Sequence, residues 1–190
     1  MSRAVHQIER DSFLELRSLV DLGHLPPLSR AVTERVIHAS GDIAYAEDLL
    51  LDESALERAH IAILEGAPIA TDVRMVSSGI TSVTTHCALD HADPDGVPTR
   101  TASGTRTLAE QLGDRTVWVV GCAPTAVRAL LEGPFDPTLV IGLPVGFIDA
   151  AESKAALAAS SLSFVTNVGP KGGSAVAAGA LNALLYLEED

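Results

Sequence analysis

The chain has 190 residues, a length that suits one domain with a sizeable core, and we expect residues 1–190 to form a single domain. Hydrophobic residues make up 47% of the chain but aromatic residues only 4%, so the core must consist mainly of Ala, Val, Leu and Ile, as in sheets covered by helices. With 25 acidic against 13 basic residues, the formal net charge of −12 argues against binding to nucleic acid or to an anionic membrane surface.

The first two predicted helices lie near the N-terminus. Apolar residues at helical spacing indicate a helix from about Ala4 to Leu19, with Ser12 near the edge of its apolar face. A second helix opens at Pro26-Pro27 and ends at Gly41, because glycine tolerates the left-handed conformation of a helix C-cap. The apolar stripes are Ile8, Phe13, Leu16 and Val20 in the first helix and Leu28, Val32 and Val36 in the second.

One histidine, His38, falls in the last turn of the second predicted helix, and Arg35 projects on nearly the same face. Carbonyl groups at a helix C-terminus favour the charged imidazolium, and imidazole titrates near the pH of the cell. The position therefore suits a group that donates and recovers one proton. A histidine on a helix is more often an ordinary surface residue or a core residue with satisfied hydrogen bonds, and the sequence leaves these interpretations open.

From residue 49 onward the sequence predicts alternating elements. An apolar run, Leu49–Leu51, precedes Ser54–Glu57, which has the spacing of a capping box and predicts a helix that ends at Gly66. The later alternation of strands and helices is typical of parallel strands joined by right-handed crossovers, and we expect an α/β fold with a mainly parallel sheet. The predicted strands are Ile69–Thr71, His86–Leu89, Val117–Val120, Leu139–Ile141 and Ser163–Val165, and later helices begin near Ser103, Pro124, Ala150 and Gly173.

The segments that follow the predicted strands are rich in Gly and Pro. Ligands of parallel α/β folds bind beyond the carboxyl ends of the strands, and glycine lets backbone N–H groups approach an anion closely. An acidic protein could bind an acidic ligand in this way. Tight turns also require glycine, which explains any one segment equally well, but the four segments together favour a binding rim. They are 72–74, 121–125, 142–147 and 169–174.

Other features narrow the choice of function. The polar segment from Asp90 to Thr101 predicts a mobile loop, and its acidic residues with His91 lack the spacing of a calcium site and the soft ligands of a zinc site, so we expect no metal. Arg106 could hold a carboxylate bidentately or be an ordinary exposed arginine. The sequence has no dinucleotide-binding, Walker or nucleophile-elbow motif, which disfavours dinucleotide oxidoreductases, P-loop phosphotransferases and typical hydrolases.

The cysteines and apolar runs indicate the compartment. Cys87 and Cys122 fall in runs that we expect to be buried, and their spacing suggests neither a disulfide nor a metal site. The longest apolar run, Ala175–Leu187, is interrupted by polar or small residues and is too short to cross a bilayer. The N-terminus leads directly into a polar helix. We expect a cytoplasmic protein with reduced thiols and no membrane association.

Together these motifs resemble the precorrin-8X methylmutase family of cobalamin biosynthesis, also called cobalt-precorrin-8 methylmutases. The resemblance runs nearly end to end, and its most specific part is 143–147 with Glu152-Ser153-Lys154. Ser40 stands where the family usually has cysteine, and the family usually has a basic residue within the segment Ser82–Thr85. The other matching segments are 10–13, 35–41, 66–69 with Asp72, 75–76, 79–81, 123–126 and 172–175.

The resemblance implies a flavodoxin-like three-layer α/β/α sandwich and a homodimer. It implies an isomerase that moves a methyl group from C11 to C12 of precorrin-8X, or of its cobalt form, to give hydrogenobyrinate or cobyrinate without a cofactor. In the family pattern His38 is the catalytic proton donor or acceptor. The expected contacts to the tetrapyrrole substrate, taken from the resemblance and the glycine rim together, are Ser12, Arg35, Thr81, Thr105, Arg106, Gly172, Gly173 and Ser174.

Two competing functions remain open at this stage. The departures after Thr81 are compatible with a non-catalytic corrinoid-binding or carrier protein, which would bind the tetrapyrrole without converting it. The fold and the glycine loops alone are compatible with a flavodoxin-like protein that binds a flavin or another nucleotide.

Overall fold

The computed structural model describes residues 7–187, in which six strands form one sheet in the order β1-β6-β5-β4-β2-β3. All neighbouring strands are parallel except β1, which is antiparallel to β6. The strands are β1 (Leu49–Leu51), β2 (Ile69–Thr71), β3 (His86–Cys87), β4 (Val117–Val120), β5 (Leu139–Gly142) and β6 (Phe164–Asn167). The helices are α1 (Gln7–Leu19), α2 (Pro27–Ser40), α3 (Tyr45–Asp48), α4 (Glu53–Leu64), α5 (Arg74–Ser78), η1 (Ala88–His91), α6 (Arg100–Leu112), α7 (Pro124–Glu132), α8 (Ala150–Ala158) and α9 (Ser174–Leu185).

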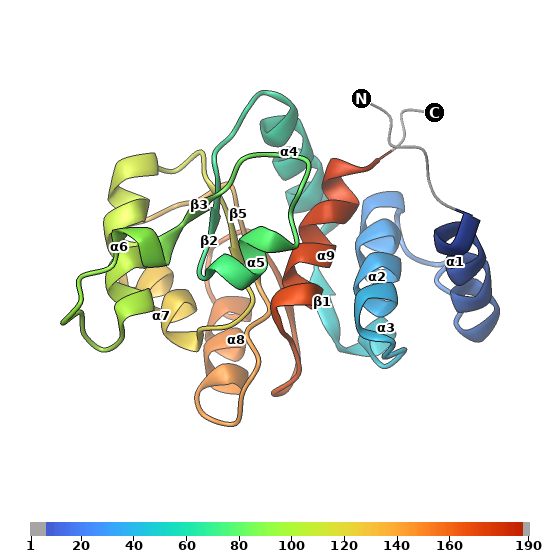
Figure 1. The fold of residues 1–190 in the computed structure, drawn as a ribbon. Helices are drawn as coiled ribbons and strands as arrows, with labels where there is room; N and C mark the ends of the chain where they lie inside the picture. The colour runs from blue at the N-terminus through green and yellow to red at the C-terminus, as the bar shows by residue number, and fades with distance from the viewer. Residues whose placement is uncertain (1–6, 188–190) are drawn as a thin grey trace.

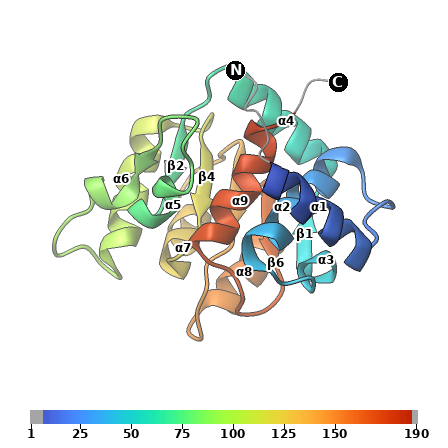
Figure 2. The ribbon, with the colours of Figure 1, turned by 45° about the vertical axis from the view of Figure 1, so that its right-hand side comes forward.

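Helices cover both faces of the sheet, which confirms the predicted three-layer α/β/α sandwich (Figure 1). Successive side chains of a strand point to opposite faces, so each strand contributes to two cores. Val117 and Val119 pack with the core under α2, α4 and α9, whereas Trp118 and Val120 pack with the core under α6, α7 and α8. Helix α1 lies outside these layers, against α2 (Figure 2).

The local signals that predict the second helix are confirmed in α2. Pro27 occupies the first turn, and Gly41 caps the end with φ 67° and ψ 16° while its N–H donates to the carbonyl of Ile37. Val32 and Val36 are fully buried. Helix α9 is apolar on all sides, as expected for a helix enclosed by protein, and it packs between α2 and the sheet.

Several predicted boundaries were wrong because a nearer capping group starts the helix. Asp52 caps α4 by accepting a hydrogen bond from the N–H of Ala55, so Ser54 lies inside the first turn. Thr99 caps α6 in the same way, so this helix begins before Ser103 and Arg106 lies in its middle. These side chains accept from the otherwise unpaired N–H groups of the first turn.

Other predictions needed smaller corrections. Ile8 is 73% exposed and does not belong to the apolar stripe of α1. The predicted start of that helix, Ala4, lies outside the described residues. The strand predicted over His86–Leu89 stops at Cys87 and continues as η1, and the last strand runs to Asn167 rather than to Val165. Leu49–Leu51 forms an edge strand, α5 was not predicted, and Cys122 is only half-buried.

A buried carboxylate stands where the strand order reverses. From β2 the chain passes to β3 on one side and then returns to β4 on the other. Asp72 directly follows β2, is fully buried, and accepts hydrogen bonds from three consecutive N–H groups after β4. Burial raises the pKa of its carboxyl, and the N–H donors oppose that rise. The donors are Gly121 at 3.2 Å, Cys122 at 2.8 Å and Ala123 at 2.8 Å.

Asp72 therefore ties the end of β2 to the start of α7 and occupies N–H groups that the sequence assigned to an anion-binding rim. The same carboxylate also accepts from the N–H of Val73 at 2.9 Å.

None of the helices described between residues 7 and 187 combines the length and the apolar character that a bilayer crossing requires.

We predict that Asp72→Asn lowers the free energy of unfolding by at least about 2 kcal/mol, because an amide keeps one acceptor oxygen and turns donor hydrogens toward buried N–H groups. Asp114→Asn is the matched control, since the exposed Asp114 also accepts a backbone hydrogen bond, from Asp136 at 3.1 Å. Urea denaturation of both variants measures the difference. Equal stability of Asp72→Asn and the wild type would contradict the assigned role.

Candidate functional site

The imidazole of His38 is held by two consecutive residues of α1. The hydroxyl oxygen of Ser12 lies 2.9 Å from Nδ1 of His38. The ring of Phe13 stacks on the imidazole with a centroid distance of 4.8 Å and an interplanar angle of 16°. One residue therefore fixes an edge of the ring and the next fixes a face. The sequence placed Phe13 in an apolar stripe and in the matching segment 10–13, but it assigned a substrate contact only to the neighbouring Ser12.

The contact with Ser12 leaves the second ring nitrogen available. Among residues 7–187, Nε2 of His38 makes no hydrogen bond, and the side chain is half-buried. A serine hydroxyl can donate to a bare Nδ1 or accept from a protonated one. Ser12 is therefore compatible with either tautomer, and Nε2 can hold or release a proton without losing the contact that orients the ring.

Arg35 lies one turn before His38 and joins the same cluster. Its guanidinium stands 4.9 Å from the centroid of Phe13 and 5.9 Å from that of Tyr186, the residue after α9. Nη1 is 2.5 Å from a carboxylate oxygen of Glu9, and the arginine side chain is 20% exposed. A ligand carboxylate that reached Arg35 would therefore compete with Glu9 for the guanidinium.

The loop between β6 and α9 carries three of the predicted contact residues. A Cβ atom on Gly172 would lie 2.2 Å from the carbonyl oxygen of Leu143, so only glycine fits there. The N–H of Gly173 donates to the same carbonyl at 2.9 Å. Ser174 begins α9 and is half-buried. Part of the glycine signal therefore reflects close packing of this loop against the segment after β5.

The remaining predicted residues lie elsewhere. Thr105 is fully buried and its hydroxyl donates to the carbonyl of Thr101 at 2.8 Å. Arg106 donates to the carbonyl of Val97 at 2.9 Å. Thr81 is exposed after α5. Figures 1 and 2 both show α6 and α1 at opposite ends of the molecule. The structure thus brings together Ser12, Arg35 and His38, but not Thr105 and Arg106.

The segment from Asp90 to Thr101 consists of the end of η1, a connection and the start of α6. The Asp90 carboxylate pairs with Arg74, and Oδ1 of Asp93 accepts from the N–H of Asp95 at 2.9 Å. Within residues 7–187, no three His, Cys, Asp or Glu side chains are grouped so as to hold a metal ion.

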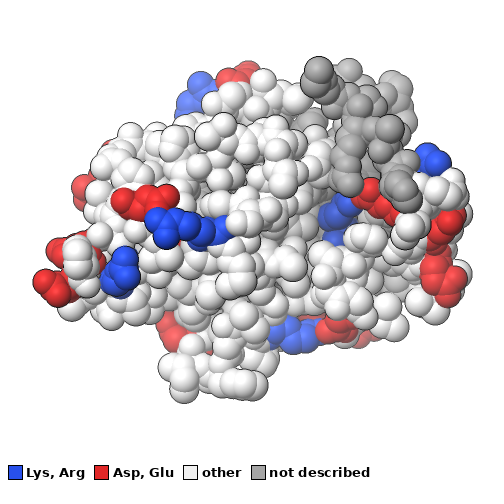
Figure 3. All heavy atoms as spheres, viewed as in Figure 1, with Lys and Arg blue, Asp and Glu red and all other residues white. Residues whose placement is uncertain are grey.

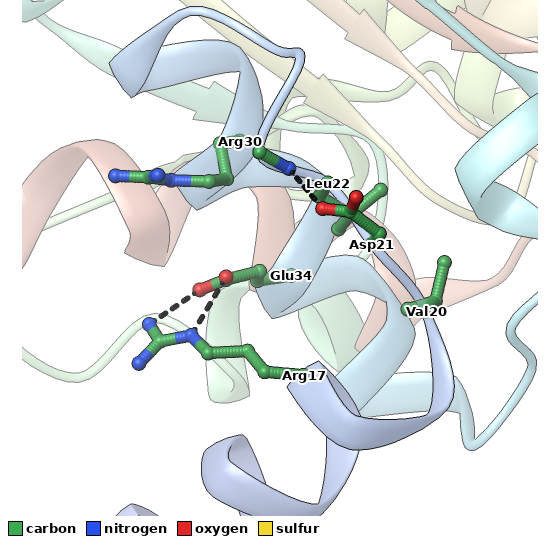
Figure 4. A pocket seen from close by; sticks show the side chains of 7 residues that line it. Arg17, Val20, Asp21, Leu22, Arg30 and Glu34 are labelled. Carbon is green, nitrogen blue, oxygen red and sulfur yellow. Dashed lines mark hydrogen bonds and ion pairs between the residues drawn. The ribbon is translucent and has the colours of Figure 1, made fainter.

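A hollow of about 390 Å³ lies on the other side of the α1–α2 contact. In Figure 4 the side chains of Arg17 and Glu34 point toward each other. Nε and Nη2 of Arg17 donate to the two carboxylate oxygens of Glu34, at 2.8 Å and 2.7 Å. Hydrogen bonding with Glu34 raises the pKa of Arg17. Because this arginine is already paired, the hollow offers a ligand no preferred charge. Its lining residues are Arg17, Val20, Asp21, Leu22, Gly23, Arg30 and Glu34.

Comparisons with known proteins agree with the sequence motifs. Residues 7–187 match the family described as CbiC, precorrin-8X methylmutase. The chain is similar to the precorrin-8X methylmutase of Pseudomonas aeruginosa, with 38% identity over 194 residues and 93% of each chain covered. It is 36% identical over 197 residues to the cobalt-precorrin-8 methylmutase of Methanothermobacter thermautotrophicus, covering 97% of this chain and 94% of that one.

A solved structure is also similar. The crystal structure of precorrin-8X methylmutase from Thermus thermophilus matches with a TM-score of 0.85 and 31% identity, over 94% of this chain and 93% of that chain. These matches cover almost the full length of the chain, including α1, α2 and the loop between β6 and α9 (168–173, the glycine loop). The chain therefore belongs to the precorrin-8X methylmutase family and is an isomerase of cobalamin biosynthesis.

Proposed function

We propose that His38 exchanges the proton that accompanies migration of the methyl group from C11 to C12 of the corrinoid ring. This proposal rests on two contacts of the imidazole, the hydrogen bond with Ser12 and the stacking with Phe13. Together they orient the ring and leave Nε2 without a hydrogen bond to residues 7–187. The isomerisation breaks one carbon–carbon bond and forms another within the same molecule. The protein's task is therefore to position the ring and to adjust its protonation.

The substrate carries many carboxylates, and two kinds of group on this chain suit them. Arg35 offers a planar guanidinium with several donors, already oriented by Phe13 and Tyr186. The loop that ends at Gly173-Ser174 leads into the N-terminus of α9, where backbone N–H groups point outward from the helix. We assign binding, and not proton exchange, to Arg35, because an arginine stays protonated at any working pH.

Conversion of precorrin-8X tests the function directly. Purified wild-type protein should change the visible spectrum of precorrin-8X to that of hydrogenobyrinate, whereas His38→Ala should bind the tetrapyrrole and lose at least about a hundredfold in rate. Thermal unfolding of the variant, followed in parallel, controls for loss of fold. A stable His38→Ala that binds product and turns over at a nearly normal rate would refute the assigned role.

The same assay separates the carrier function from catalysis. A carrier would bind the tetrapyrrole tightly and leave its chromophore unchanged over many hours. Family membership favours the isomerase over both the carrier and a flavin-binding protein.

The name of the relative from Methanothermobacter thermautotrophicus includes cobalt, and the name of the relative from Pseudomonas aeruginosa does not. We therefore propose that the protein recognises the corrinoid ring and its carboxylates, and not cobalt.

We predict that Arg35→Ala weakens product binding by about 2 kcal/mol, or roughly thirtyfold, and slows the bound reaction less. Arg10→Ala is the matched control, because Arg10 is an exposed arginine of α1 that donates to Gln7 at 2.8 Å. Titration of each variant with hydrogenobyrinate and saturation kinetics provide the two numbers. Unchanged affinity with abolished turnover in Arg35→Ala would contradict the binding role.

We also propose a homodimer that completes the site. Within one chain, α6 with Thr105 and Arg106 lies far from His38, and a second copy could bring its α6 to the first copy's histidine. Two chains of net charge −12 repel each other, and a largely uncharged contact surface keeps that repulsion small. Figure 3 shows such a surface around α5 and α9, with charged side chains gathered toward its margins, and Met75 of α5 is 65% exposed.

Mixing two impaired variants tests this arrangement at a substrate concentration below saturation, where the loss of a binding contact lowers the rate. If Arg106 of one copy serves His38 of the other, mixed dimers of His38→Ala and Arg106→Ala contain one intact site, and random exchange should restore about a quarter of the sites. The control mixes His38→Ala with Ser12→Ala, which lie in the same site of the same chain and should restore none. A monomer in light scattering, or no recovery with Arg106→Ala, would end the proposal.

The proposed extent and location of the protein follow from the same observations. Both hydrophobic cores share one sheet, which supports a single domain. We propose a cytoplasmic location, as a biosynthetic isomerase of this family would need.

A further inference from the structure

The sequence contains two lysines, and both meet at the loop between β6 and α9. Lys154 of α8 is only 1% exposed. Its ammonium donates to the side-chain oxygen of Asn167 at 3.0 Å and to the main-chain carbonyl of Lys171. Asn167 is the last residue of β6 and Lys171 stands directly before Gly172-Gly173. The ammonium therefore holds the two ends of one short loop together.

Burying an ammonium whose hydrogen-bond acceptors are neutral costs free energy, because the charge is removed from water. Burial, together with the positive charge of Lys171, lowers the pKa of Lys154 to about 8. An apolar side chain of the same length would avoid the cost of removing the charge from water. The hydrogen bonds of Lys154 fix the positions of the Asn167 side chain and of the main chain at Lys171, which an apolar side chain could not do.

The loop in turn holds the segment that follows the histidine helix. The ammonium of Lys171 lies 2.9 Å from a carboxylate oxygen of Asp42 and 2.6 Å from one of Asp48, and it stands 4.6 Å from the ring centroid of Tyr45. The N–H of Val168 also donates to the carbonyl of Asp48, at 2.9 Å. Asp42 comes directly after Gly41, the residue that caps α2. The contacts thus run without a gap from α8 through the loop to the end of the helix that carries His38.

We propose that Lys154 is a positioning residue for the methyl shift: its buried ammonium fixes the glycine loop and, through Lys171, the segment at the end of α2. The inference rests on the proposed roles of His38 and of the glycine loop. Lys154 is buried and makes its hydrogen bonds to Asn167 and to the main chain at Lys171, not to His38, so in this proposal it acts by keeping both sides of the site at a fixed separation. A displacement of about 1 Å at reacting groups can cost on the order of a hundredfold in rate.

Amide hydrogen exchange tests the positioning without using the reaction. Lys154→Met keeps an unbranched side chain that is one atom shorter, and it removes the charge and all donors. It should speed exchange about tenfold or more in 168–176 and also in 41–48, a segment to which Lys154 donates no hydrogen bond. The matched control is Thr166→Val, which removes a buried hydroxyl of the same strand that donates to the carbonyl of Gly142 at 2.7 Å. The control should leave exchange in 41–48 unchanged.

Kinetics then link the positioning to the site. At a temperature where both variants are folded, Lys154→Met should lose about tenfold or more in kcat with a smaller change in KM, whereas Thr166→Val should keep the kcat of the wild type. If Lys154→Met does not fold, Lys171→Met removes the contacts of the Lys171 ammonium with Asp42, Asp48 and Tyr45 and should speed exchange in 41–48 alone. If the wild type does not convert precorrin-8X, the proposed function fails, but the exchange result still decides the coupling.

Two results would overturn the inference. One is normal exchange in 41–48 in a folded Lys154→Met or in Lys171→Met. The other is fast exchange in both segments with an unchanged kcat.

Discussion

The carboxylate of Asp72 occupies backbone N–H groups that would otherwise be open to a ligand beyond the end of β4. In most doubly wound sheets, the point where the strand order reverses opens a crevice lined by backbone N–H groups. Here a fully buried aspartate takes the N–H groups of Gly121, Cys122 and Ala123 for itself and ties β2 to α7. The usual anion site is thereby converted into a structural joint. Those three N–H groups are therefore closed to a ligand, and we propose the site at the contact of α1 with α2, where Ser12, Arg35 and His38 come together.

That cluster is supported from two directions. From outside, α1 places Ser12 and Phe13 on the imidazole of His38, and the guanidinium of Arg35 lies 4.9 Å from the centroid of the Phe13 ring. From the sheet side, the loop between β6 and α9 reaches the end of α2 through the ion pairs of the Lys171 ammonium with Asp42 and Asp48. A histidine that must hold and release a proton gains from such support, because a fixed ring needs no reorganisation at the moment of transfer.

Local signals in the sequence were sufficient for much of this structure. Pro27 and Gly41 mark the two ends of α2, and runs such as Val117–Val120 mark strands covered on both faces. Contacts between distant segments were not predictable in the same way. No local pattern shows that Ser12 reaches across 26 residues to His38, or that the three leucines at 49–51 pair antiparallel with β6. The glycines were read as a ligand signal, but Gly172 is also required by the carbonyl of Leu143.

If His38 exchanges the proton of the methyl shift, the corrinoid ring must bind with the imidazole of His38 at its edge. A crystal structure of the protein with bound hydrogenobyrinate measures this directly. We expect Nε2 of His38 within hydrogen-bond distance of the ring or of the proton-bearing atom, and a carboxylate of the ligand on Arg35. A ring bound away from α2, for example in the hollow beside Arg17 and Glu34, with His38 in no contact with it, would contradict the account.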